Sequence, residues 1–273
     1  MDSAHPDFGD LFDELPLWSA PFGLMLLDRV PLRPDLSVLD VGAGTGFLSL
    51  ELAQRCGPRS RVVAVDSWPA ATKRLRRKLE MLGLGNVRVL EQDAATLELA
   101  AASIDVVVCN LGLNNFEDPE AVLKACARAM KPGARMLLTS NLVGHMGEFY
   151  EVFRAALLEV GLGERIPALD AHLAHRGTAD SVRRLLTSAG LVPGRVTTDT
   201  LRLRYADGTA LLAHALIRFG FRPAWEAVVG AADVPRAFAA LEHRLNELAA
   251  GHGELSLSVP MACFEAERPA PGR

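Results

Sequence analysis

Residues 38–46 of this 273-residue chain read VLDVGAGTG, and this stretch decides the fold class. A short apolar run is followed by three glycines at alternate positions and then by a helix-forming segment. Glycine allows the backbone to adopt positive φ and to approach a ligand closely. A helix that begins there also presents free N–H groups to a polar ligand. The stretch therefore predicts a strand, a tight turn and a ligand-binding helix N-terminus.

The runs that follow extend this unit into a doubly wound sheet. Apolar runs without polar alternation are typical of parallel strands covered on both faces. Helical patterns separate these runs, and alternating strands and helices form right-handed βαβ units. The predicted strands are VLDV (38–41), RVVAVD (61–66), VRVLE (87–91), IDVVVCN (104–110) and RMLLTS (135–140).

The second half of the chain has a different pattern. Residues 147–162 and 178–189 predict helices with one apolar side. The segments LRLRY (201–205) and LSLSV (255–259) alternate strictly, which is typical of strands with one solvent-facing side at an antiparallel edge. Residues 207–250 between them have a helical pattern and are too long for a turn. We interpret them as a helical cap beside the active site.

Composition and charge exclude several classes of function. The net charge of −4 favours neither nucleic acid nor an anionic membrane. The four cysteines lie far apart without a C-x-x-C pair, which argues against a zinc site and against disulfides. No apolar run approaches the roughly 18 residues that span a bilayer, and the N-terminus lacks a signal-peptide pattern. We expect a soluble, cytoplasmic monomer or homodimer without a metal, which acts on a small molecule and binds no nucleic acid or membrane.

One basic run could suggest RNA binding. Residues 73–78 read KRLRRK, but Leu75, Leu79 and Leu82 form an apolar stripe at helical spacing. The charges then lie on the outer side of the helix, and no aromatic residues interleave with them. The run predicts a solvated helix face.

Acidic residues are spaced to hold a nucleoside that carries an amino acid. Asp40 can accept hydrogen bonds from a cationic amine, directly or through water. Asp66 ends the second strand, where its carboxylate can bind both ribose hydroxyls or cap the next helix. Asp93 follows the third strand and can meet the adenine edge, while Trp68 can stack on the purine or pack on its helix. A dinucleotide fingerprint is G-x-G-x-x-G, but the third glycine here, Gly46, comes one position early.

In this order, the motifs resemble those of the class I (Rossmann-like) S-adenosylmethionine-dependent methyltransferases of the bacterial small-molecule type. The resemblance covers residues 36–140, where VLDVGAGTG, VVAVD, QDA, IDVVVCN and MKPGARMLLT correspond to the five motifs. It implies S-adenosyl-L-methionine as cofactor and S-adenosyl-L-homocysteine as product. The expected cofactor-binding residues are Trp18, Asp40, Gly42, Ala43, Gly44, Gly46, Asp66, Ser67, Trp68, Asp93, Ala94, Asn110 and Leu111.

Together, the patterns and the resemblance predict an α/β fold. It is a Rossmann-like, doubly wound, seven-stranded and mostly parallel sheet with an antiparallel last strand and a helical cap insertion. The expected division is an N-terminal helical lid (1–35), a cofactor-binding core (36–206) with a helical insertion near 141–176, the cap (207–250), and a final strand with the tail (251–273).

His145 is the candidate general base. It directly follows the fifth strand, the carboxyl ends of parallel strands border the ligand crevice, and histidine titrates near neutrality. Glu148 and Tyr150 are candidate catalytic residues that orient His145 or contact the acceptor. A structural polar contact at the helix start explains His145 equally well.

Three further residues are candidates for binding the acceptor. Asn114 and Asn115 can bond it through their amides, or merely hold their own loop. His172 forms, together with His175 and Arg176, the most polar patch of the connection to the predicted cap. A metal at His172 is disfavoured because no carboxylate stands at fitting spacing.

The predicted activity is transfer of a methyl group to O, N or C of a small molecule by in-line displacement. Alignment of the reactants supplies most of the acceleration, and a base is needed only if the acceptor must lose a proton. The alternatives are a nicotinamide-dependent oxidoreductase, and a non-methylating cofactor-binding protein or cyclase on the same fold.

Overall fold

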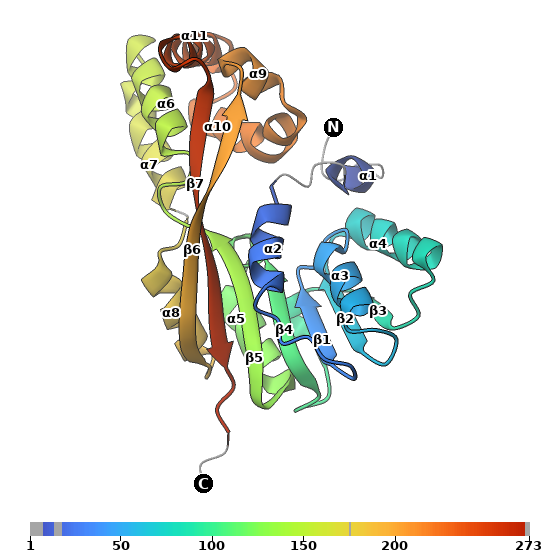
Figure 1. Cartoon of the computed structure of the whole chain (residues 1–273). Coiled ribbons are helices and arrows are strands. Elements are labelled where there is room, and N and C mark those ends of the chain that lie inside the picture. The colour runs from blue at the N-terminus through green and yellow to red at the C-terminus, as the bar shows by residue number, and fades with distance from the viewer. Residues whose placement is uncertain (1–7, 14–17, 175, 271–273) are drawn as a thin grey trace. The chain divides into compact units, whose positions relative to one another are not determined.

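The computed structural model describes residues 8–13, 18–174 and 176–270. Its seven strands form one sheet in the order β3-β2-β1-β4-β5-β7-β6 (Figure 1). Strands β1 to β5 are parallel, whereas β7 runs antiparallel to its neighbours. The strands are β1 (Ser37–Val41), β2 (Arg61–Asp66), β3 (Val87–Glu91), β4 (Ile104–Asn110), β5 (Met130–Asn141), β6 (Val192–Tyr205) and β7 (Leu255–Glu267). The predicted fold class is confirmed.

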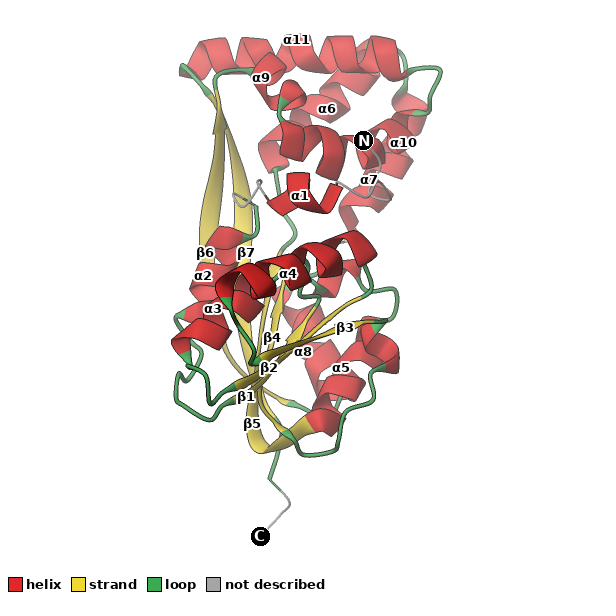
Figure 2. Ribbon diagram, turned by 90° about the vertical axis from the view of Figure 1, so that its right-hand side faces the viewer, coloured by secondary structure: helices red, strands yellow, loops and turns green. Residues whose placement is uncertain are grey.

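The strand order reverses at β1, and this places helices on both faces of the sheet. Right-handed crossovers from β1 toward β3 put their helices on one face, and those toward β5 put theirs on the other. The first group is α2 (Ala20–Leu27), α3 (Phe47–Arg55) and α4 (Pro69–Leu82). The second group is α5 (Pro119–Ala129) and α8 (Ala179–Ser188), which pack on each other (Figure 2). A short helix, α1 (Phe8–Asp13), packs on α4.

The chain forms two compact units. Among the described residues, the helical unit comprises 141–176 and 199–260, and the sheet unit comprises all others. The helical unit therefore joins the predicted insertion and the predicted cap. Its long helices α6 and α11 pack on each other. Its helices are α6 (Gly147–Glu159), α7 (Ile166–Ala174), α9 (Gly208–Ala213), a π-helix (Ile217–Phe221), α10 (Arg222–Val229) and α11 (Val234–His252). Short 3₁₀ turns at Ala94–Thr96, Leu113–Asn115 and Gly163–Arg165 complete the helical elements of the described chain.

Helix starts agree well with the sequence. The α8 helix begins at a capping box in which Thr178 and Ser181 exchange side-chain and backbone hydrogen bonds. Pro69 occupies the first turn of α4, and Gly83 ends that helix in the left-handed conformation. None of the helices in the described ranges combines the length and the apolar character needed to cross a membrane.

Strand lengths were predicted less well. Strand β6 begins at Val192 rather than at residue 201. Its first half was missed because it is largely exposed and lacks the apolar alternation by which a strand is predicted. Strand β7 continues to Glu267, eight residues past the predicted end. Strand β5 starts at Met130 rather than at residue 135, and runs through the Pro132–Gly133 pair. The alternation predicted for LRLRY (201–205) is confirmed, because Arg202 and Arg204 are exposed and Leu203 between them is buried.

Candidate functional site

The glycine loop after β1 is tied to the neighbouring strand. The N–H groups of Gly42 and Ala43 both donate to the carbonyl of Val65, at 2.9 and 3.0 Å. Gly44 and Gly46 have φ of 55° and 96°, in the left-handed region that favours glycine. A Cβ on Gly46 would lie 2.2 Å from a methyl group of Leu75, whereas one on Gly44 would meet nothing within 4 Å. Gly46 therefore allows helix packing, and Gly44 presents bare backbone to open space.

The carboxylate of Asp66 is held beside this open backbone. One oxygen accepts the N–H of Gly44 at 2.7 Å, and the other accepts the N–H of Trp68 at 2.8 Å. Partial burial raises the pKa of Asp66, and the two backbone hydrogen bonds oppose that rise. Because each oxygen retains a free lone pair, the fixed carboxylate can also accept two vicinal hydroxyl groups.

Asp40 is buried beneath the same loop. It accepts the Ser49 hydroxyl at 2.6 Å and also the Ser49 backbone N–H. Helix α3 has Gly46 as its N-cap, which offers no side chain, so Asp40 caps the helix from the preceding strand. Burial, together with the charge of Asp66, raises the pKa of Asp40 to about 7. The sequence analysis missed Ser49, whose position three residues after Gly46 is that of a capping partner.

The region expected to bind adenine lies where β2 and β3 end. Asp93 is exposed and accepts the N–H of Ala95 at 2.9 Å, and Ala94 is buried. Ser67 is exposed and Trp68 is half-buried. Backbone pairing from Asp66 to Gln92 joins these segments, because the N–H of Gln92 donates to the carbonyl of Asp66.

The loop after β4 is held by hydrogen bonds that the sequence did not reveal. The Asn110 amide donates to the carbonyl of Ser19 at 3.0 Å and accepts the Thr139 hydroxyl at 2.6 Å. Leu111 follows with a φ of 61°, an uncommon conformation for a residue with a branched side chain, and its N–H donates to Thr139. This arrangement joins the segment before α2 to the expected methionine end of the site.

The two asparagines proposed to bind the acceptor make bonds within this loop region. Asn114 donates to the Ser140 hydroxyl at 3.0 Å, and Asn115 donates to the carbonyl of Leu111 at 3.1 Å. These contacts favour the loop-holding interpretation that was left open for both residues. Trp18, half-buried, packs on Phe22 with ring centroids 5.6 Å apart.

The basic run on α4 was predicted to be a solvated helix face, but part of it pairs with another helix. Arg74 and Lys78 form ion pairs with Asp13 of α1 at 3.0 and 2.7 Å. Asp13 also bonds Thr45 of the glycine loop. Leu82, predicted to face inward, is 52% exposed. An acidic helix far away in sequence thus covers part of the basic face, which no local pattern could indicate.

The helical unit brings together several of the candidate catalytic residues. Tyr150 is buried, and its hydroxyl lies 3.1 Å from Nε2 of His172 and accepts the indole N–H of Trp225 at 3.0 Å. Arg176 lies over the Tyr150 ring, 5.9 Å from its centroid. His145 is buried, with its ring stacked on Phe221 at 5.6 Å. Trp225 and Arg176 were not among the predicted site residues.

His145 and Glu148 differ from the sequence expectation. Burial, followed by the nearby charges of Arg176 and His172, lowers the pKa of His145 to about 3, so the expected titration near neutrality is wrong. Both oxygens of Glu148 accept hydrogen bonds from Ser258, at 3.0 and 2.6 Å. Burial alone would raise the pKa of Glu148, but these bonds hold it below its usual value. Glu148 therefore joins the start of α6 to β7.

Comparisons with known proteins agree with this geometry. A family model described as a methyltransferase domain matches residues 38–133. The chain is 30% identical over 263 residues to nocamycin O-methyltransferase of Saccharothrix syringae, and the match covers 92% of each protein. The chain is a class I S-adenosylmethionine-dependent methyltransferase.

Other proteins resemble this methyltransferase over part or all of its length. It is 35% identical over 113 residues to the ubiquinone/menaquinone biosynthesis C-methyltransferase UbiE of Idiomarina loihiensis, covering 41% of this chain and 45% of that protein. The crystal structure of YcgJ from Bacillus subtilis has a TM-score of 0.60 at 17% identity, covering 93% of this chain and 99% of that one. This structural likeness concerns the fold.

S-adenosylmethionine is the cofactor of this methyltransferase, and the residues of the sheet unit fit it. Gly44 leaves the space that a side chain would fill, and Asp66 offers a fixed carboxylate for two hydroxyl groups. The family assignment, together with the early third glycine, leaves the nicotinamide-dependent alternative without support.

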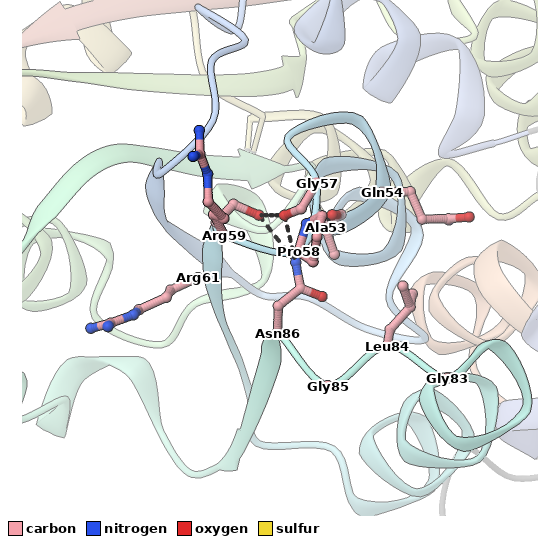
Figure 3. Close-up of a pocket in the computed structure, with 11 residues that line it drawn as sticks. Ala53, Gln54, Gly57, Pro58, Arg59, Arg61, Gly83, Leu84, Gly85 and Asn86 are labelled. Atoms are coloured by element: carbon pink, nitrogen blue, oxygen red, sulfur yellow. Dashed lines mark hydrogen bonds between the residues drawn. The ribbon is translucent and has the colours of Figure 1, made fainter.

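A large pocket on the sheet unit of the methyltransferase lies away from this site. It has a volume of about 650 Å³ and is lined by residues 53–54, 57–61 and 83–86, which lie before or at the start of β2 and β3 (Figure 3). Ligands of doubly wound sheets bind at the carboxyl ends of the strands, whereas this pocket lies at the amino ends. The Asn86 amide bonds the carbonyls of Ala53 and Gly57 and the Ser60 hydroxyl, all at 3.1 Å, and so braces the lining.

Proposed function

We propose that this methyltransferase transfers the methyl group to an oxygen atom of a small-molecule acceptor, and that the helical unit recognises the acceptor. The observation that carries the proposal is the hydrogen-bonded pair of Tyr150 and His172, together with the likeness to nocamycin O-methyltransferase along nearly the whole chain. An O–H acceptor must lose a proton, and a phenol bonded to an imidazole is a group that can take it.

The chain contributes to this reaction through positioning. When bound, S-adenosylmethionine supplies a methyl group on a positively charged sulfur, which leaves as a neutral thioether. Gly44 and Asp66 hold the nucleoside, and Asp40 keeps α3 and the glycine loop in place. Alignment of reactants corresponds to effective molarities of about 10⁵ M or more. An acceptor that binds with its O–H proton gives this proton up to the Tyr150–His172 pair, which adds about 10²–10⁴-fold, whereas an acceptor that binds already ionised needs no base.

His145 has a different role in this proposal. Its pKa of about 3 makes it a poor proton acceptor at neutral pH. Its ring is buried and stacks on Phe221, so it packs the interior of the helical unit. Glu148 and Ser258 fix the segment that carries it.

Residues 1–35 act as a lid over the cofactor in this proposal. Support comes from α1, whose Asp13 reaches both Lys78 of α4 and Thr45 of the glycine loop. The close approach also depends on Gly9, where a Cβ would lie 2.6 Å from the carbonyl oxygen of Ala70. Leu17, expected to belong to this lid, lies outside the described residues.

The test is methyl transfer from methyl-labelled S-adenosylmethionine to matched acceptors. The panel contains a carboxylic acid, a phenol and an enolisable diketone as oxygen acceptors, an aniline for nitrogen, and an indole for carbon. We expect labelled products only from the oxygen acceptors, identified by mass and by the position of the label. Label found only on nitrogen or carbon would overturn the proposed acceptor atom.

A further inference from the structure

Four aromatic rings stack one after another in the helical unit. The rings of His145, Phe221, Trp225 and Phe149 follow one another at centroid distances of 5.6, 6.0 and 4.1 Å, with interplanar angles of 25–28°. The π-helix at Ile217–Phe221 ends at the second of these rings, and such turns occur often at functional sites. This stacking fixes the indole of Trp225, whose polar edge faces Tyr150.

The hydrogen bonds of Tyr150 have a defined direction. The indole N–H of Trp225 can only donate, so the Tyr150 oxygen is its acceptor. The guanidinium of Arg176 also hydrogen-bonds this side chain and can only donate. The phenolic hydrogen is then left for Nε2 of His172, 3.1 Å away. Neutral His172 must therefore carry its proton on Nδ1.

Arg176 carries a positive charge beside Tyr150 and His172. It forms no ion pair with any carboxylate in the described part of the chain, and its buried Nε has no hydrogen-bond partner there. Its Nη1 donates to the carbonyl of His172 at 3.5 Å. A guanidinium is always charged and binds planar, two-oxygen anions through paired N–H groups. Its described titratable neighbours are His145, Tyr150 and His172, and none of these three side chains offers Arg176 a carboxylate.

We propose that the guanidinium of Arg176 binds an ionised oxygen group of the acceptor, with Tyr150 and His172 as positioning residues for this guanidinium and Trp225 as a positioning residue for the Tyr150 hydroxyl. The acceptor class is then a small organic acid, either a carboxylate or an enolate. This inference rests on the proposed function and names its substrate class. The anion supplies the electron pair that forms the O–CH₃ bond, and the pair of the breaking C–S bond goes to sulfur.

The first test measures ligand binding, which needs no turnover. Benzoate, the enolate of dimedone and neutral benzamide are titrated into the S-adenosylhomocysteine complex by calorimetry and ligand-observed NMR. We expect benzoate or the dimedone enolate to bind at least tenfold more tightly than benzamide, and the better of the two tells carboxylate from enolate. Equal binding of all three would overturn the inference.

Variants assign the preference to Arg176. Arg176→Gln is expected to remove the preference for anions, and Arg176→Lys to retain only part of it, because a lysine has charge without the planar fork. Arg165→Gln is the matched control, since Arg165 in the same unit already has Asp233 as an acid partner at 3.7 Å. If Arg176→Gln does not fold, the anion preference of Arg176→Lys, compared with that of the wild type, still tests the role of Arg176. An unchanged preference in the Arg176 variants would overturn the inference.

Two readouts separate this inference from its premises. S-adenosylhomocysteine affinity should be unchanged in the Arg176 variants, so a loss there would point to misfolding instead. If anions bind at Arg176 but label transfer goes to nitrogen or carbon, the proposed acceptor atom fails while the anion site stands.

The role of Trp225 has its own spectroscopic signature. In Trp225→Phe, ring stacking remains but the indole N–H is lost. The ¹⁵N shifts of His172 should show an unprotonated Nε2 in the wild type and a mixture of tautomers in the variant. The same tautomer in both proteins would remove Trp225 from this role.

Discussion

The two units arrange their polar groups in different ways. In the sheet unit, Asp66 is fixed by the backbone N–H groups of Gly44 and Trp68, which belong to two adjacent loops. In the helical unit, Tyr150 is fixed by side chains, and its partner Trp225 lies 75 residues away in sequence. A site built on backbone tolerates changes of side chain but depends on its glycines. A site built on side chains depends on each member of the group.

The largest effect is expected at Gly46. Gly46→Ala forces a Cβ against Leu75 at a positive φ, and should lower the free energy of unfolding by about 3 kcal/mol. Gly44→Ala has a positive φ but open space, and should cost only about 1 kcal/mol while weakening S-adenosylhomocysteine binding. Urea unfolding measures the first effect and calorimetry the second. Equal stability losses in the two variants would contradict the different roles assigned to the two glycines.

Asp66 should control cofactor affinity without controlling the fold. Asp66→Ala is expected to weaken S-adenosylhomocysteine binding by about 1–3 kcal/mol, because charge-assisted hydrogen bonds are lost. Glu91→Ala is the control, because Glu91 pairs in register with Asp66 on the next strand but bonds Thr72 and Arg76 on the surface. Calorimetric titration should show a change only for Asp66. Wild-type affinity in Asp66→Ala would remove this carboxylate from the ribose site.

Asp40 should make the sheet unit less stable as the pH rises. Its pKa is about 7 in the folded chain against a usual 3.8, so its unfavourable contribution grows between pH 4 and pH 7. Relative to the wild type, Asp40→Asn should therefore gain stability from pH 5 to pH 8 in urea unfolding. If Asp40→Asn instead lost stability relative to the wild type from pH 5 to pH 8, the raised pKa of Asp40 would be excluded.

The pH dependence of stability that His145 causes should have the opposite sign to that of Asp40. Its pKa falls from 6.5 to about 3 on folding, so it costs no stability above pH 6.5 and destabilises the folded chain increasingly as the pH falls toward 3. His145→Phe keeps an aromatic ring for stacking on Phe221. Relative to the wild type, it should gain stability from pH 8 to pH 5. A pH-independent difference would show that the ring titrates normally.

The smallest effect is expected at the lid. Asp13→Asn weakens the pairs with Arg74 and Lys78, and should speed S-adenosylhomocysteine release about two- to fivefold, as expected for about 0.5–1 kcal/mol. The difference should vanish in high salt, where these pairs are screened. Stopped-flow fluorescence measures the release, and Glu51→Gln, which changes an exposed pair with Arg55, is the control. Equal release rates for wild type and Asp13→Asn at low salt would show that the ion pairs of Asp13 do not hold the lid over the cofactor.

Local patterns predicted the sheet unit well and the helical unit poorly. The glycine loop, Asp66 and the strand ends follow from short-range signals of spacing and hydrophobic period. Ser49 and Thr139 were missed, because a hydroxyl next to a buried acid or amide has no distinctive pattern. Trp225 was missed, and Arg176 was recognised only as part of a polar patch, because their significance comes from Tyr150, to which neither is close in sequence.

The sequence by itself determined the parallel sheet, the ligand-binding turn after β1 and the residues that surround that turn. These features depend on the conformational freedom of glycine, on strand periodicity and on residues near one another in the chain. Only the tertiary structure decided that His145 is buried and neutral, that an acidic helix covers part of the basic face of α4, and that a guanidinium with no carboxylate partner among the described residues lies beside Tyr150. Burial and long-range electrostatics depend on which distant segments pack together, and the local sequence does not encode that packing.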